Sequence, residues 1–129
     1  MPEDRNVADA KSDLKTSVAR LNEALDEVKK RRDAIPPPSF KEDGLLLKEQ
    51  ADLQAERTAE ELLLNHLNAV AVEVSPPTAE SGQALAKAIR DLDEMKRCTN
   101  ELARFLDLCA SFADSMDNHR REIDKRTKP

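Results

Sequence analysis

Apolar residues recur along this chain with the spacing of helices, and prolines divide the pattern into three segments. In the first segment Val7, Leu14, Leu21, Val28 and Ile35 stand seven residues apart. A sevenfold apolar row is typical of helices that pack side by side as in a coiled coil. The spacing therefore predicts a helix over residues 6–34. The other positions of its packing seam are expected to be Lys11, Val18, Leu25 and Arg32.

The second segment lies between two proline groups, residues 36–38 and 76–77, neither of which can continue a helix. Ser39 followed by Glu42 three residues later matches a capping box, which marks the start of a helix. Apolar residues are dense near both ends of the segment, and its middle is rich in alanine. We predict a helix over residues 40–74.

The third segment carries two sevenfold rows. One row is Leu85, Leu92, Thr99, Leu106 and Ala113, and the other is Ala88, Met95, Leu102, Cys109 and Met116. No glycine or proline interrupts the segment after Gly82, so the pattern predicts one helix over residues 78–125. A helix of roughly 45 residues is unusual in a small domain. The alternative is a kink near residues 111–115, which would create a fourth short helix.

Short links make successive helices antiparallel neighbours. The expected fold is therefore an all-α, up-down-up antiparallel three-helix bundle with an overlong third helix, in one domain over residues 1–129. Residues 40–47 would contact residues 28–35 and 105–112 in one cluster, and residues 62–70 would contact the start of the first helix and residues 85–92 in another. This is the architecture of spectrin-like bundles in general, and architecture alone does not indicate function.

The third helix would outrun the second, so the chain after about Ala113 would overhang the bundle. An overhanging helix with spaced apolar residues is a candidate docking segment, and a frayed, solvated tail is the alternative. Ile89, Phe105 and Phe112 also widen the apolar stripe on this helix. The residues expected to bind a partner are Ile89, Phe105, Phe112, Met116 and Ile123.

Basic residues gather near the C-terminal ends of the first and third helices, which the three-helix topology would bring to the same end of the bundle. They are Lys29, Lys30, Arg31, Arg32, Arg120, Arg121, Lys125 and Arg126. Such a basic pole would suit an anionic ligand or a lipid head group at a membrane surface. The alternative is that these cations only complement the helix dipoles.

Composition and charge limit which kinds of partner and which cellular compartment we expect for this chain. The net charge of −5 disfavours broad nucleic-acid binding. The chain has neither a signal-like N-terminus nor an apolar run of roughly 20 residues that could span a bilayer. Two cysteines, Cys98 and Cys109, are expected about three turns apart on one helix as free thiols, which favours the cytoplasm. The basic tract at residues 29–32 would allow nuclear import in a eukaryote.

Residue patterns of known enzyme classes are missing. Gly44 and Gly82 are isolated, and the sequence contains no Gly-x-Ser-x-Gly, Cys-x-x-Cys or Glu-x-x-His. His66 and His119 fall on different predicted helices, and the acidic pair Glu60 and Glu61 is expected on a solvated face. We therefore expect no enzyme activity, no cofactor and no metal site.

The leading hypothesis is a non-catalytic protein–protein interaction module. It would serve as a structural or adaptor subunit, or scaffold, that uses coiled-coil-type helix packing within a larger assembly. Charged residues make up 36% of the chain and aromatic residues 2%, so its core is thin and association would stabilise it. Its partner would be a second copy of the chain or a helical protein. The alternative function is binding of an anionic ligand or lipid head group at the basic pole.

Overall fold

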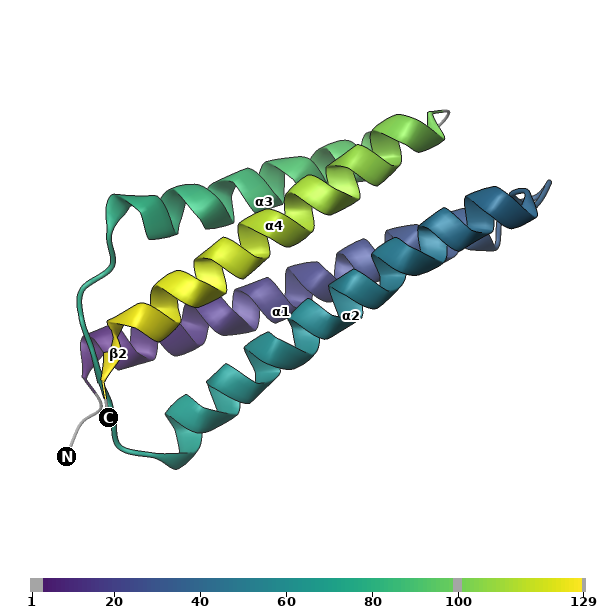
Figure 1. The fold of residues 1–129 in the computed structure, drawn as a ribbon. Coiled ribbons are helices and arrows are strands. Elements are labelled where there is room, and N and C mark those ends of the chain that lie inside the picture. The colour runs from purple at the N-terminus through teal and green to yellow at the C-terminus, as the bar shows by residue number, and fades with distance from the viewer. Residues whose placement is uncertain (1–3, 99–100, 129) are drawn as a thin grey trace.

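A computed structural model describes residues 4–98 and 101–128, and this part of the chain is all-α apart from one short pair of strands (Figure 1). The elements are α1 (Arg5–Arg32), α2 (Phe40–Ala69), β1 (Glu73–Val74), α3 (Ala79–Arg97), α4 (Leu102–Arg126) and β2 (Thr127–Lys128). The predicted all-α class is confirmed. The predicted three-helix bundle is wrong, because the third segment forms two helices. None of the described helices has the length and apolar character needed to cross a membrane.

The third segment reverses direction just after α3. Cys98 has extended backbone angles (φ −76°, ψ 104°), and its N–H still donates to the carbonyls of Glu94 and Met95. The predicted seam residue Thr99 lies outside the described residues. The alternative kink near residues 111–115 is also wrong, because those residues lie within α4. Reversal lets α4 bury its apolar face against the other helices, and each buried Phe or Met stabilises the fold by roughly 1.5–3 kcal/mol.

The four helices run up, down, up and down, and two of the neighbouring pairs are parallel (Figure 1). α1 packs against α2 and α3, and α4 packs against the same two helices. α2 and α3 lie diagonally opposite and do not touch within the described part of the chain. The link from α2 to α3 therefore crosses one end of the bundle. There β1 pairs antiparallel with β2, which places Glu73 opposite Lys128.

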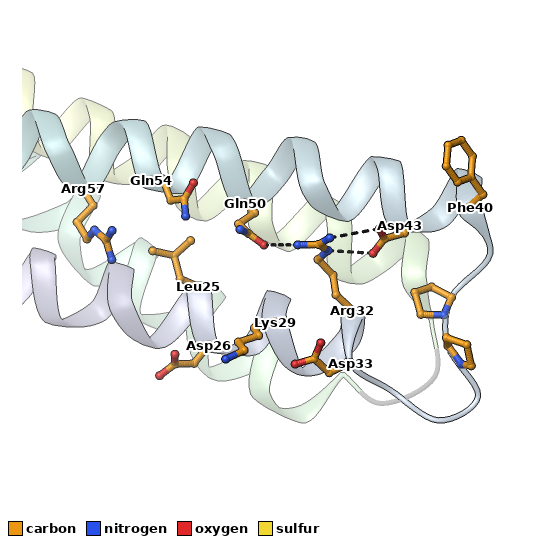
Figure 2. Close-up of a pocket in the computed structure, with 12 residues that line it drawn as sticks. Leu25, Asp26, Lys29, Arg32, Asp33, Phe40, Asp43, Gln50, Gln54 and Arg57 are labelled. Atoms are coloured by element: carbon orange, nitrogen blue, oxygen red, sulfur yellow. Dashed lines mark hydrogen bonds and ion pairs between the residues drawn. The ribbon is translucent and has the colours of Figure 1, made fainter.

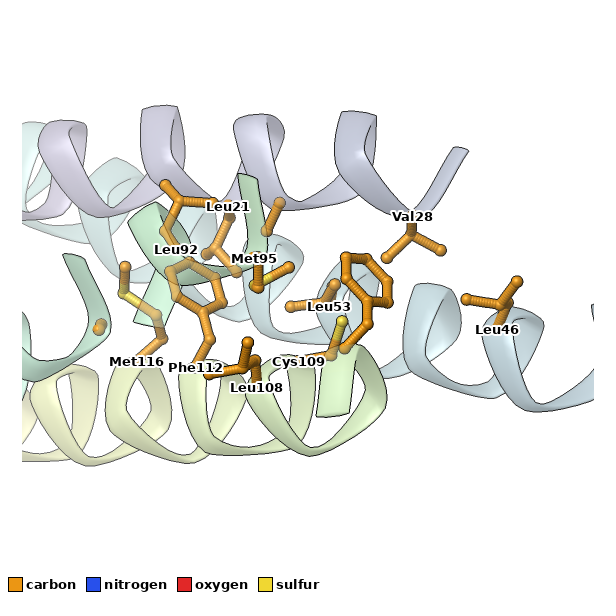
Figure 3. Packing of buried hydrophobic residues seen from close by; sticks show 13 residues of the cluster. Leu21, Val28, Leu46, Leu53, Leu92, Met95, Leu108, Cys109, Phe112 and Met116 are labelled. Atoms are coloured by element: carbon orange, nitrogen blue, oxygen red, sulfur yellow. The ribbon is translucent and has the colours of Figure 1, made fainter. Parts of the chain in front are cut away.

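The core consists of two apolar clusters stacked along the bundle, and Figure 3 shows residues of the larger one. The larger cluster contains Leu21, Ala24, Val28, Leu46, Leu53, Ala88, Leu92, Met95, Phe105, Leu108, Cys109, Phe112 and Met116. The smaller cluster contains Val7, Ala10, Leu14, Leu67, Val74 and Ile123. The predicted meeting of Val28 with the starts of α2 and α4 is confirmed, as is that of Val7 with the end of α2. The expected contact of residues 62–70 with residues 85–92 is wrong, because α2 and α3 do not touch within the described part of the chain.

Three details of the predicted helices need correction. The second buried row of α1 is Ala10, Ser17 and Ala24, whereas the expected seam residues Lys11, Val18, Leu25 and Arg32 are half-buried. Ile35 and Phe40, expected in the core, are 96% and 97% exposed because the chain turns outward at residues 33–39. α2 ends at Ala69, five residues early, because Val70 is extended and the following residues lead into β1.

α1, α2 and α3 each start with a side-chain cap of the ordinary kind. The predicted capping box is confirmed: Oγ of Ser39 accepts from the N–H of Glu42 at 3.1 Å, and Oε1 of Glu42 accepts from the N–H of Ser39 at 3.0 Å. Thr78 caps α3 through the N–H of Ser81. Asp4 caps α1 through the N–H of Asn6. These caps set where α1, α2 and α3 start, so the hairpin α1–α2 has a defined end, whereas α4 begins without a side-chain cap from Glu101.

Candidate functional site

The residues expected to bind a partner lie inside the bundle. Phe105, Phe112, Met116 and Ile123 are each no more than 1% exposed, and Ile89 is half-buried. The expected overhang is absent, because α4 folds back after Cys98 and packs along α2 and α3. In the folded chain these side chains therefore stabilise the core and do not form an open apolar stripe.

The basic residues do not meet at one pole. α1 runs away from the N-terminal end of the bundle and α4 returns to it, so residues 29–32 and residues 120–126 lie at opposite ends (Figure 1). The expected basic pole is wrong because it assumed that the helices carrying these two groups run in the same direction. Each end instead holds its own small basic group.

Several of these arginines hold the fold together. Arg31 donates to the carbonyl of Cys98, and its guanidinium carbon lies 4.2 Å from the centre of the Phe105 ring. At the other end Arg126 is only 7% exposed and donates to the carbonyl of Ser75 at 3.2 Å. These arginines link separate segments of the chain, which leaves less cationic surface for an anionic ligand.

A layer of polar side chains separates the two apolar clusters. Ser17, Glu60 and His119 come from α1, α2 and α4, and each is no more than 1% exposed. Each occupies a core position in a sevenfold row. The rows are Ala10, Ser17 and Ala24 in α1; Leu46, Leu53, Glu60 and Leu67 in α2; and Phe105, Phe112 and His119 in α4. Polar groups buried at the centre of a bundle influence its stability and its pH response.

The titratable groups of this layer are held in their neutral forms. Burial raises the pKa of Glu60 to about 9, and the nearby carboxylate of Glu56 adds to the rise. Neither carboxylate oxygen of Glu60 makes a well-formed hydrogen bond, although Arg120 and the Ser17 hydroxyl oppose the rise. Burial also lowers the pKa of His119, although Asp13 opposes the shift. At neutral pH the layer therefore contains a carboxylic acid and an uncharged imidazole.

Sequence reasoning missed this layer. Glu61 is exposed as expected, but the prediction that Glu60 lies on a solvated face is wrong. The signal was present, because Glu60 stands seven residues after Leu53 and seven before Leu67. His119 stands seven residues after Phe112 in the same way. Tracing each row through its polar members would have found both residues.

A buried ion pair joins α2 to α4 beside the layer. Arg120 donates to both carboxylate oxygens of Glu56, at 2.8 and 3.4 Å, and to Asp117 at 2.5 Å. The side chain of Glu56 is only 8% exposed. Burial raises the pKa of Glu56, and the bonds from Arg120 oppose that rise. Arg120 thus compensates a carboxylate that has been removed from water.

The most exposed large apolar side chains in the described part of the chain lie at the end of the α1–α2 hairpin, residues 33–40. Ile35 and Phe40 flank the three prolines, and Figure 2 shows Phe40 pointing away from the helices. A groove of about 720 Å³ runs between α1 and α2 at this end, where Arg32 binds Asp43 at 2.9 Å and Gln50 at 3.0 Å (Figure 2).

A second groove, of about 480 Å³, lies on the other side of the hairpin end. It is formed jointly by the ends of the two helical hairpins, and its apolar lining includes Leu46, Met95 and Leu102. Lys30 and Lys96 contribute charge to its lining. The hairpin end is therefore an apolar projection bordered by two grooves.

Residues 4–98 and 101–128 offer few other groups that could bind a metal ion or act as a nucleophile. No three His, Cys, Asp or Glu side chains in these ranges are placed to hold a metal ion. His66 is exposed, as expected. Cys98 and Cys109 are free thiols but belong to different parts of the α3–α4 hairpin, not to one helix as expected. Burial raises the pKa of Cys109 to about 12, which suppresses its reactivity.

Comparison with protein families, with characterised proteins and with solved structures finds no significant match. The apolar hairpin end, with its two bordering grooves, is the surface of the described chain best suited to binding a partner.

Proposed function

We propose that this chain is a non-catalytic protein–protein interaction module, an adaptor or structural subunit that docks on a partner protein through the end of its α1–α2 hairpin. The observation that carries this proposal is the exposure of Ile35 and Phe40, at 96% and 97%. Burying one such side chain against a partner would contribute roughly 1.5–3 kcal/mol to binding. Aromatic side chains inserted into a partner's pocket are common hot spots of interfaces.

The hairpin end is suited to docking because its conformation is restricted before a partner arrives. Prolines at residues 36–38 fix backbone angles between the two exposed side chains. The capping box of Ser39 and Glu42 then sets the start of α2. A restricted segment loses less conformational entropy on binding, so more of the burial free energy remains as affinity.

The four-helix bundle acts as the support for this end. Its sevenfold rows are buried within the chain, so the proposal relies on the hairpin end and not on an open coiled-coil seam. The partner is a second copy of the chain or another protein that offers an apolar pocket.

The test compares the wild-type chain with the double variant Ile35→Ser/Phe40→Ser and with a control, Leu62→Ser. Leu62 is 64% exposed but lies on α2, outside the hairpin end. Light scattering measures self-association, and affinity capture with mass spectrometry identifies other partners. We expect the wild type and the control to share an oligomer or a captured partner that the double variant loses.

The opposite result is equally clear. A wild type that stays at the monomer mass of 14.4 kDa and captures the same proteins as the double variant would refute the proposal. Circular dichroism of all three proteins checks that the bundle is intact. Because each replaced side chain is largely exposed, the substitutions should leave the fold unchanged.

A further inference from the structure

An acidic groove of about 310 Å³ runs between the parallel neighbours α2 and α4. Its lining contains five carboxylates, one lysine and two alanines: Glu49, Asp52, Glu56, Asp114, Asp117, Lys48, Ala110 and Ala113. Lys48 lies 3.9 Å from Asp52. The groove therefore holds more negative charge than its own lysine can balance.

One end of this groove shows how the bundle neutralises such charge. There Arg120 of α4 donates to Glu56 of α2 and to Asp117 on its own helix. The guanidinium thus bridges the two helices and compensates a carboxylate that is 8% exposed. A bidentate guanidinium–carboxylate pair of this kind is among the stronger polar contacts in proteins.

The same arrangement recurs seven residues earlier, but without its cation. Glu49 precedes Glu56 by seven residues, and Ala113 precedes Arg120 by seven. α2 and α4 are parallel, and a seven-residue step is nearly two helical turns. Ala113 therefore has the same position relative to Glu49 as Arg120 has relative to Glu56. An alanine supplies no charge, so this repeat of the arrangement lacks the guanidinium.

Glu49 itself is left uncompensated. It is 9% exposed, it lines the groove, and within the described part of the chain it has no hydrogen bond or ion pair. Burial raises the pKa of Glu49, and Lys48 opposes that rise. A cation placed beside Glu49 would restore the charged form and would gain a partly desolvated ion pair.

We propose that this groove binds a guanidinium or alkylammonium group from outside the chain, beside Glu49 in the place that Arg120 fills beside Glu56. The small side chains of Ala110 and Ala113 leave room for the apolar stem that carries such a group. Asp52 and Asp114 add to the attraction. The described carboxylates are not grouped closely enough for a metal ion, which favours a cation that spreads its charge over several donors.

The first experiment titrates agmatine, which carries both a guanidinium and an ammonium group, into the protein at low salt by calorimetry. We expect Glu49→Gln to weaken binding at least tenfold. Asp107→Asn removes the same charge from an exposed position of α4 outside the groove lining, and it should leave binding unchanged. Equal weakening by both substitutions would indicate general attraction to an acidic protein and would overturn the proposal.

A second variant, Ala113→Arg, supplies the missing guanidinium from within the chain. We expect it to abolish agmatine binding and to raise the urea midpoint, because Glu49 gains the partner that Glu56 already has. Unchanged agmatine binding in a folded Ala113→Arg protein would also overturn the proposal. If this variant fails to fold, the comparison of Glu49→Gln with Asp107→Asn still decides the question.

A second ligand, a short blocked peptide containing arginine, tests whether the bound cationic group belongs to a small molecule or to an arginine side chain of another protein. Saturable, Glu49-dependent binding of agmatine supports a free small cation, and such binding of the peptide alone supports an arginine side chain on another protein. Binding of neither ligand contradicts the proposal. The double variant Ile35→Ser/Phe40→Ser should bind the cation normally, so this site is tested separately from the hairpin end.

Discussion

Oγ of Ser17 on α1 lies 3.2 Å from Nδ1 of His119 on α4, and this hydrogen bond crosses the bundle between its two apolar clusters. Glu60 of α2 lies in the same layer, fully buried and without a well-formed hydrogen bond to either carboxylate oxygen. In water a glutamate would be charged at neutral pH and a histidine would be partly charged. Burial keeps both neutral here, so the layer couples the stability of the bundle to pH in two opposite directions.

Glu60→Gln is expected to remove a free-energy cost of folding that grows as pH rises. The pKa of Glu60 is about 9 in the folded chain against 4.5 ordinarily, so between these values only the unfolded chain releases the proton. The free energy of unfolding of the wild type therefore falls as pH rises through this window. Urea denaturation should show the free energy of unfolding of the variant increasing relative to that of the wild type from pH 5 upward, by about 2 kcal/mol or more at pH 8. A difference that does not change with pH would contradict this account.

His119→Gln is expected to show the opposite pH dependence. Burial lowers the pKa of His119 below its ordinary value of 6.5, so at acidic pH the unfolded chain binds a proton that the folded chain excludes. The wild type should therefore lose stability relative to the variant as pH falls below 6.5, by up to about 1.4 kcal/mol per pH unit. Thermal or urea denaturation between pH 5 and 7.5 measures the effect. The control His66→Gln replaces an exposed histidine and should follow the wild type at every pH.

Arg120→Leu should destabilise the bundle by about 3 kcal/mol, because it leaves the buried carboxylate of Glu56 without its partner. The double variant Glu56→Gln/Arg120→Leu should recover much of the loss, since no unpaired charge remains. Arg104→Leu is the matched control: Arg104 and Glu94 form an ion pair with side chains 57% and 48% exposed, and its loss should cost less than about 1 kcal/mol. Similar losses for the two single variants in urea denaturation would argue against a buried, compensating pair.

Phe112→Ala should cost about 3–5 kcal/mol of unfolding free energy, because Phe112 is fully buried in the larger apolar cluster. A docking residue on an overhanging helix would show almost no such effect. Phe40→Ala removes the same ring from a position that is 97% exposed, and its effect should stay within about 0.5 kcal/mol. If the two variants were equally stable in urea, α4 could not be packed as described.

Local sequence predicted the helices of the first two segments and part of their packing. The sevenfold spacing of Val7, Leu14, Leu21 and Val28 identified the buried face of α1, and the capping box at Ser39 identified the start of α2. Both signals act over a few residues, so they can be recognised without knowing the rest of the fold. The exposure of Ile35 and Phe40 could not be recognised in this way, because it depends on where the chain turns between helices.

The sequence by itself determined that the chain is helical and that one sevenfold row of α1, from Val7 to Val28, is buried, because helix propensity and apolar periodicity are properties of neighbouring residues. Only the tertiary structure decided that the chain reverses after Cys98, since the sevenfold rows continue through that point without a proline or glycine. The reversal is favoured by the burial of Phe105, Phe112 and Met116 against helices distant in sequence. The same reversal separates the two basic groups, buries His119 of α4 within the bundle, and brings Ala113 into the groove that Glu49 lines.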